Sequence, residues 1–156
     1  MSRAFVKESD DAGEPLPELA ISPHPNLVTP AGLRQIETRV AGLAADLRAA
    51  RKAEDKPLLA RIQRDLRYWT ERRATARVVP GAVVPPDVVR FGVNVRVRFA
   101  DDGTQRSFRL VGEDEADPIN GLVSWVAPLG KALTGRAVGD EVQVIGCAAE
   151  IIALTP

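Results

Sequence analysis

The chain has 156 residues, 45% of them hydrophobic, and its 21 basic residues balance 21 acidic ones, so that its formal net charge is zero. This composition suits one ordinary domain or two small units with a hydrophobic core, and it argues against disorder throughout. The apolar runs fall short of the roughly 20 residues that a membrane span needs, and the first residues lack the apolar stretch of a secretory signal. The single cysteine, Cys147, cannot form an internal disulfide. We therefore expect a cytoplasmic protein with no membrane contact.

The neutral total is the sum of three segments of unlike charge. Residues 1–26 have two basic and five acidic residues, residues 27–80 have twelve basic and six acidic ones, and residues 81–156 have seven basic and ten acidic ones. An uneven charge distribution of this kind suggests a charged partner that binds the segment of opposite charge.

Residues 1–26 are predicted to be a flexible, acidic arm. They are rich in proline, with Pro15, Pro17, Pro23 and Pro25, and show no hydrophobic periodicity. Their charge is opposite to that of the next segment. This leads to the hypothesis that the arm folds onto that segment as an autoinhibitory or register-setting contact.

Residues 27–80 are predicted to be a basic helical hairpin. Thr29 followed by Pro30 is typical of a helix start, because the threonine can cap a free backbone N–H and the proline needs none. Apolar residues then recur at spacings of three and four in two arms of about 20 to 24 residues, which favours an antiparallel coiled coil. The alternative is half of a larger helical bundle, but the many arginines leave only one apolar stripe on each arm. The predicted seam is Leu33, Ile36, Val40, Leu43 and Leu47, then Leu59, Ile62, Leu66, Trp69, Arg73 and Ala76.

Residues 81–156 are predicted to be a small α+β domain, set apart by the break around Pro85 and Pro86. Alternation from Val93 to Phe99 and from Gln105 to Val111, across a turn at Asp101-Asp102-Gly103, indicates a β-hairpin. A third strand is expected over Leu122–Ala127, a short helix over Pro128–Leu133, and two more strands over Glu141–Ile145 and Ala149–Leu154. The fold class is therefore α+β, with a mainly antiparallel sheet and one helix after the coiled-coil hairpin.

The C-terminal part carries a block of residues with specific spacing. It reads Phe108-Arg-Leu-Val-Gly-Glu-Asp-Glu-Ala-Asp117, then Gly121, Ser124, Pro128-Leu-Gly-Lys-Ala-Leu-Thr-Gly135 and Val138-Gly-Asp-Glu-Val142. This block resembles the C-terminal domain of the bacterial GreA/GreB family of transcript-cleavage factors. Leu27-Val-Thr-Pro-Ala-Gly-Leu33 resembles the start of the hairpin in the same family. The resemblance covers residues 27–156 and implies a helical hairpin followed by an FKBP-like domain.

The resemblance also implies a partner, RNA polymerase. The FKBP-like domain would dock at the rim of the polymerase secondary channel, and the hairpin would enter the channel and contact nascent RNA. Acidic residues at the hairpin tip would help the polymerase to hold Mg²⁺ and to activate water for RNA cleavage. The chain would then be a monomeric accessory factor and not an enzyme, with no cofactor or metal of its own. The implied docking residues are Glu113, Asp114, Glu115, Asp117, Ser124, Pro128, Leu129 and Gly130; the implied channel-facing cations are Arg48, Arg51, Lys52, Arg61 and Arg64.

The hairpin tip departs from the family. The signature of the form L-G-D-x-S-E-N-A-x-Y has no counterpart here, and the turn offers only Glu54 and Asp55 between Lys52 and Lys56. The hairpin also looks shorter than that of the family, and a carboxylate that stops about 5 to 10 Å short cannot ligate a metal. Two versions of the function follow: a cleavage stimulator that uses Glu54 and Asp55, or a non-cleaving occupant of the channel that inhibits or competes with other factors.

Two other classes of function remain open at this stage. An FKBP-like domain suggests a peptidyl-prolyl isomerase, although the C-terminal part has only four of the aromatic residues that such a pocket needs, namely Phe91, Phe99, Phe108 and Trp125. The basic hairpin alone suggests a nucleic-acid binder, although arginines spread around a coiled-coil surface are weak evidence for one. The four carboxylates from Glu113 to Asp117 lack supporting ligands, so we expect an exposed loop that serves folding and docking and not a metal site.

Overall fold

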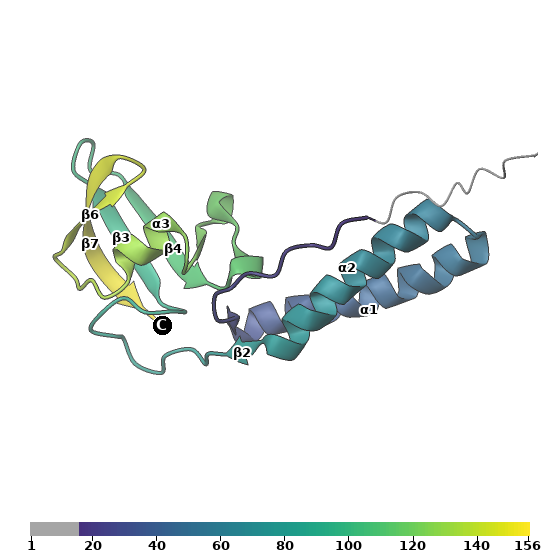
Figure 1. Cartoon of the computed structure of the whole chain (residues 1–156). Coiled ribbons are helices and arrows are strands. Elements are labelled where there is room, and N and C mark those ends of the chain that lie inside the picture. The colour runs from purple at the N-terminus through teal and green to yellow at the C-terminus, as the bar shows by residue number, and fades with distance from the viewer. Residues whose placement is uncertain (1–15) are drawn as a thin grey trace, which may run out of the picture.

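Two long helices project as an antiparallel hairpin from a small curled sheet (Figure 1). The computed structural model describes residues 16–156. Helix α1 spans Pro30–Ala53 and helix α2 spans Lys56–Thr75. Their lengths of 24 and 20 residues confirm the predicted hairpin, and the α+β class is confirmed as well.

The start of α1 and the seam between the helices follow from local sequence. The Thr29 side chain accepts a hydrogen bond from the backbone N–H of Gly32, and Pro30 is the first helical residue. Along the seam Ile36, Val40 and Ile62 are buried.

The predicted seam position Arg73 is wrong, because Arg73 is exposed and Arg72 is buried in its place. The last turn of α2 faces the C-terminal domain as well as α1. Arg72 is therefore the buried residue of this turn, because its guanidinium pairs with the Asp114 carboxylate of that domain.

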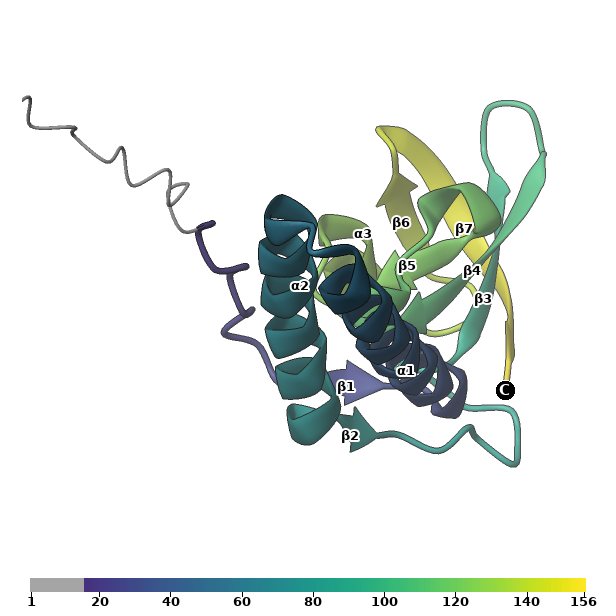
Figure 2. The same cartoon turned by 90° about the vertical axis from the view of Figure 1, so that its right-hand side faces the viewer.

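The base of the hairpin is closed by two short strands that the sequence did not predict. Strand β1 (Leu27–Val28) and strand β2 (Arg77–Val78) pair in parallel, so the chain enters α1 and leaves α2 side by side. The backbone N–H of Arg77 donates to the Asn26 carbonyl at 2.8 Å, and that of Val79 donates to the Val28 carbonyl at 2.9 Å. Figure 2 looks from the hairpin tip along the two helices toward this base, with the sheet behind.

The C-terminal domain has a five-stranded sheet in the order β5-β4-β3-β7-β6. Only β4 and β5 pair in parallel, so the sheet is mainly antiparallel, as predicted. Helix α3 (Pro128–Leu133) matches its prediction and contacts both edge strands. The strands span β3 (Asn94–Phe99), β4 (Gln105–Val111), β5 (Leu122–Ser124), β6 (Glu141–Val144) and β7 (Cys147–Thr155).

The main difference from the predicted strands lies at β5, which ends at Ser124 instead of Ala127. The Ala127 backbone N–H donates to the Ser124 carbonyl at 3.0 Å, so the chain turns there into α3. Two 3₁₀ helices, Glu113–Glu115 and Pro118–Asn120, separate β4 from β5.

The buried apolar cluster of the C-terminal domain is built from residues between Val89 and Leu154, with inward-facing strand residues such as Val95, Leu110 and Ile151 at its centre. No hairpin residue belongs to this cluster. The hairpin and the domain therefore meet through other contacts. No helix among residues 16–156 is long and apolar enough to cross a membrane.

The predicted arm is described only in part, because residues 1–15 lie outside the described residues. Residues 16–26 run as an extended segment beside α2 toward the hairpin base (Figure 1). The sequence predicts a flexible arm over this stretch. The flexibility stays a prediction; in the structure, Glu18, Ser22 and Asn26 are hydrogen-bonded to α2 and to the C-terminal domain.

Candidate functional site

The hairpin tip is a tight turn at Glu54 and Asp55. Glu54 ends α1 with a left-handed backbone at φ 56°. Asp55 caps α2, and its Oδ1 accepts a hydrogen bond from the backbone N–H of Leu58 at 3.0 Å. Such a cap satisfies a free donor in the first helical turn. One Asp55 oxygen is therefore directed back into the protein.

The charges around this turn do not favour a cation. Arg51, Lys52 and Lys56 surround the two carboxylates, and all five residues are exposed. Mg²⁺ needs several hard oxygen ligands in octahedral geometry, and within residues 16–156 no group of three His, Cys, Asp or Glu side chains could hold a metal ion. The tip does not fit Mg²⁺ by itself, and we derive no catalytic step through it.

The predicted channel-facing cations lie on the outer surface of the hairpin. Arg48, Arg51, Lys52 and Arg61 are exposed on the half of the hairpin next to the tip. Arg64 differs, because it is half-buried and its guanidinium pairs with Asp65 at 2.7 Å. The surface near the tip is thus a set of exposed cations that can meet a polyanion.

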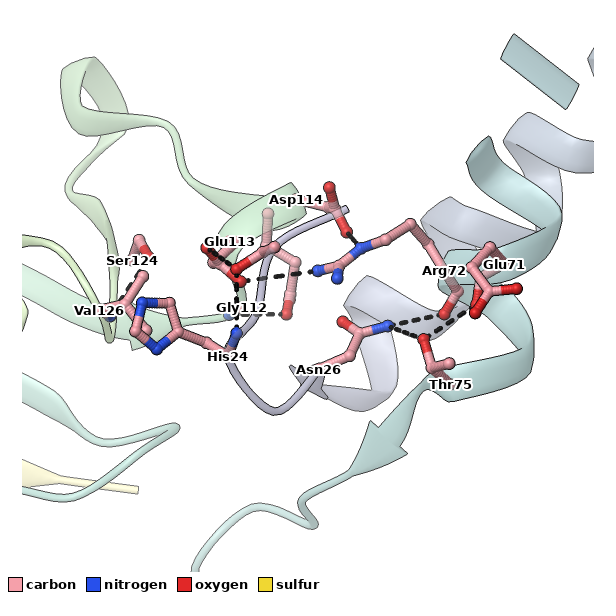
Figure 3. A network of polar contacts seen from close by, with 12 residues as sticks. His24, Asn26, Glu71, Arg72, Thr75, Gly112, Glu113, Asp114, Ser124 and Val126 are labelled. Atoms are coloured by element: carbon pink, nitrogen blue, oxygen red, sulfur yellow. Dashed lines mark hydrogen bonds and ion pairs between the residues drawn. The ribbon is translucent and has the colours of Figure 1, made fainter. Parts of the chain in front are cut away.

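At its other end the hairpin is fixed to the C-terminal domain by a polar joint centred on Arg72. Arg72 is only 2% exposed, and its Nε donates to Asp114 Oδ2 at 2.5 Å, while a terminal nitrogen lies 3.8 Å from Glu113. The Tyr68 hydroxyl donates to the other Asp114 oxygen at 3.0 Å. Burial, followed by the charge of Asp114, raises the pKa of Tyr68 above its ordinary value. Figure 3 shows Arg72 extending from α2 toward Glu113 and Asp114.

Glu115 makes the second half of the joint. It is 8% exposed, and its carboxylate accepts from the backbone N–H and hydroxyl of Thr29 and from the backbone N–H of Gly112. This carboxylate packs against the first turn of α1 at Gly32, where an added Cβ would collide with it. The motif residues Thr29 and Gly32 of the hairpin therefore belong to one contact with Glu115 of the C-terminal block.

The expectation of an exposed loop over Glu113–Asp117 is wrong for the first three carboxylates, which hold the joint. Asp117 is half-buried and accepts from the Asn120 side-chain amide at 2.6 Å. The other docking candidates lie elsewhere: Ser124 at the end of β5, and Pro128, Leu129 and Gly130 in α3. Gly130 is buried against the Ser124 carbonyl, where a side chain would collide.

Three of these candidates line a shallow apolar groove of about 600 Å³ between β5, α3 and the turn after β6. Its walls include Pro118, Val123, Ser124, Pro128, Leu129 and Ile145. A groove with mainly apolar walls and few polar groups is a candidate binding site. Helix α3 and strand β6, which border the groove, lie at the end of the molecule opposite the hairpin tip (Figure 1).

Ile145 is one of the groove residues that sequence reasoning missed. It is 80% exposed and has a left-handed backbone at φ 52°, which is a strained conformation for a β-branched residue. Together with Gly146 it forms the two-residue turn between β6 and β7. Such turns usually have Asn or Asp at the first position. An isoleucine at this position is unusual, and it was the signal in the sequence that could have identified Ile145 as a site residue.

The chain is similar in sequence to known proteins. Residues 84–155 match the model of the GreA/GreB transcription elongation factor C-terminal domain. The transcription elongation factor GreA of Rhodospirillum rubrum is 32% identical over 135 residues, which cover 75% of this chain and 86% of that protein. GreA of Chloroflexus aurantiacus is 33% identical over 114 residues, covering 71% of this chain and 73% of that protein.

Other matches are partial or remote. The chain spans about half the length of other curated relatives that it matches, as with GreA of Desulfovibrio desulfuricans, which is 38% identical over 79 residues, 51% of this chain and 49% of that protein. Among solved structures, GreA factor homolog 1 (Gfh1) of Thermus thermophilus aligns with a TM-score of 0.42 at 20% identity, covering 85% of this chain and 100% of that one. GreA/GreB from Nitrosomonas europaea aligns with a TM-score of 0.42 at 23% identity, covering 85% and 99%.

Proposed function

The chain belongs to the GreA/GreB family of transcription elongation factors, and from this premise we propose that it binds RNA polymerase at the secondary channel. There it modulates elongation or the rescue of backtracked complexes, as a monomeric accessory factor in the cytoplasm. The observation that carries the proposal is the apolar groove built from residues of the family block, with Ser124, Pro128 and Leu129 in its walls.

The shape of the molecule supports a two-part contact with the polymerase. Helix α3, which borders the groove, and the hairpin tip lie at opposite ends of the molecule (Figure 1). A 24-residue α1 at 1.5 Å per residue reaches about 36 Å. A polymerase element seated in the groove would leave the hairpin free to enter a channel.

The charge of the hairpin supports contact with RNA inside that channel. Arg48, Arg51, Lys52 and Arg61 present cations on the half next to the tip, and each cation that neutralises a phosphate adds to a salt-dependent attraction. RNA binding by this surface should therefore weaken as salt rises.

The tip favours the non-cleaving version of this function. Asp55 caps α2 through one carboxylate oxygen, and Glu54 is flanked by cations. A tip of this kind contributes less negative charge to a polymerase-bound metal than a cluster of free carboxylates would. We propose that the protein occupies the channel, where it inhibits or competes with other factors, without stimulating cleavage.

Binding is tested by size-exclusion chromatography with core RNA polymerase at low salt. A photo-crosslinking amino acid at Lys52 reports the position of the tip in the same sample. We expect co-migration, and crosslinks to polymerase residues that line the secondary channel. Failure to co-migrate, or crosslinks confined to the outer surface of the polymerase, contradicts the proposal.

The two versions are separated by an RNA cleavage assay on a stalled, backtracked complex. We expect the wild-type protein to leave the cleavage rate at its intrinsic level and to slow cleavage by an added cleavage factor. The double variant Glu54→Ala, Asp55→Ala should behave in the same way. Stimulation by the wild type that the double variant loses would instead assign these carboxylates a role in cleavage.

A further inference from the structure

The segment Leu16–Asn26, here called the strap, lies outside the region of family resemblance. It has no helix or strand, yet it crosses from the side of α2 to the C-terminal domain (Figure 1). Figure 3 shows its last residues between the two parts, with His24 next to Ser124 and Val126, and Asn26 next to the end of α2.

The strap is bound to the hairpin at two points. The Glu18 carboxylate accepts two hydrogen bonds from the Arg67 guanidinium, at 2.5 and 3.2 Å, and this pairing lowers the pKa of Glu18. Asn26 is 5% exposed, and its side-chain amide donates to the Arg72 carbonyl at 2.7 Å and to the Thr75 hydroxyl at 3.2 Å.

Between those two points the strap is bound to the C-terminal domain. The Ser22 hydroxyl donates to the Glu113 carboxylate at 2.9 Å. The His24 ring meets the Trp125 ring edge to face, with centroids 6.2 Å apart and an interplanar angle of 72°. Edge-to-face aromatic pairs stabilise a contact beyond the effect of their buried area.

The joint that these contacts span lies outside the apolar core of the C-terminal domain. The buried apolar cluster of the C-terminal domain includes no hairpin residue, and the direct contacts described above are the polar bonds of Asp114 and Glu115. Charged and hydrogen-bonded contacts can rearrange in water at a smaller free-energy cost than an interdigitated apolar core can. The contacts that the strap adds on both sides of the joint therefore have a large effect on the angle between the hairpin and the C-terminal domain.

We propose that the strap fixes the orientation of the hairpin relative to the C-terminal domain. It pairs with α2 through Glu18 and with the domain through Ser22 and His24, so that rotation about the joint must break contacts on one side. The strap thereby sets the direction in which the hairpin tip points from the groove. This inference concerns the free protein and does not depend on the proposed function.

The test is a distance measurement in the full-length protein. Spin labels are attached to the native, exposed Cys147 and to a cysteine introduced by Ala49→Cys near the tip, and the distance distribution is recorded by pulsed electron paramagnetic resonance. We expect one narrow distribution. The triple variant Glu18→Ala, Ser22→Ala, His24→Ala should widen it and shift its mean, while circular dichroism shows unchanged helix content.

The matched control removes three exposed polar side chains that make no side-chain hydrogen bond among the described residues: Glu37→Ala, Gln63→Ala and Thr70→Ala. It should keep the narrow distribution. A triple variant as narrow as its control overturns the proposal.

A charge exchange tests the hairpin side of the strap separately. Glu18→Arg and Arg67→Glu should each widen the distribution, because each places like charges together. The double exchange should restore the wild-type width. A double exchange as wide as the single ones contradicts the pairing of Glu18 with Arg67.

Discussion

The two ends of the hairpin use carboxylates in different ways. At the joint, Asp114 and Glu115 are held by an arginine, a tyrosine, a threonine and backbone N–H groups, and little of either is exposed. At the tip, Glu54 and Asp55 are exposed among cations, and one Asp55 oxygen caps a helix. Acidic residues in this protein thus fix the position of the hairpin more clearly than they equip its tip for metal chemistry.

Among substitutions that compare the joint with the tip, Arg72→Ala is expected to cause the largest loss of stability. Arg72→Ala leaves Asp114 without its charge partner in a site that is largely shielded from water. Removing one member of a buried ion pair costs about 3–5 kcal/mol. Denaturant unfolding, followed by circular dichroism, should show this loss. Arg73→Ala, at the exposed neighbouring position, should stay within about 0.5 kcal/mol; equal losses for the two variants would contradict the assignment of the joint to Arg72.

A second effect is expected at Gly32. Gly32→Ala places a methyl group against the Glu115 carboxylate, and overpacking of this kind costs about 1–3 kcal/mol. Gly42→Ala on the same helix meets open space and should stabilise the protein by about 0.5–1 kcal/mol. Thermal unfolding of both variants checks the opposite signs. Stabilisation by both would mean that Glu115 can move away from α1 freely.

At the tip the expected effect is smaller. Asp55→Ala removes the cap of α2 and should destabilise the hairpin by about 1 kcal/mol. Asp46→Ala, at an exposed position on α1, is the control and should have little effect. The comparison is made by urea unfolding at neutral pH. If Asp55→Ala is as mild as its control, then the Asp55 carboxylate is free for another role, and the cleavage-stimulating version gains support.

The smallest effect concerns the pH dependence of the joint. Tyr68 is the only tyrosine, so its phenolate absorbance can be titrated directly. Its pKa is raised in the folded state, so its contribution to stability is complete below the unfolded value of about 10 and is lost as pH rises through the folded value. Asp114→Asn should lower the midpoint toward 10. An unchanged midpoint would show that burial alone causes the shift.

Local features of the molecule could be predicted from the sequence, whereas contacts between distant residues could not. The spacing of Ile36, Val40 and Ile62 and the Thr29 cap act within a few residues, so the hairpin was predictable. Hydrophobic periodicity assigned the buried position at the end of α2 to Arg73. It could not indicate Arg72, because the burial of Arg72 depends on Asp114, which lies 42 residues further along the chain.

The candidate site shows the same division. The family block identified Ser124, Pro128 and Leu129, but not that they face one groove with Ile145. The block also could not show that Glu115 packs on Gly32, since that contact depends on how the hairpin and the domain meet. Strands β1 and β2 are too short for alternation to be visible.

The central claim, that this protein binds RNA polymerase through the apolar groove, is tested most directly by the affinity of two variants for core RNA polymerase. Ile145→Asp places a charge in the groove, whereas Val138→Asp changes an exposed apolar residue that does not line it. Loss of a central interface contact costs about 2 kcal/mol or more, so Ile145→Asp should weaken binding by about 30-fold while Val138→Asp binds like the wild type. Equal affinities for both variants and the wild type would contradict the account.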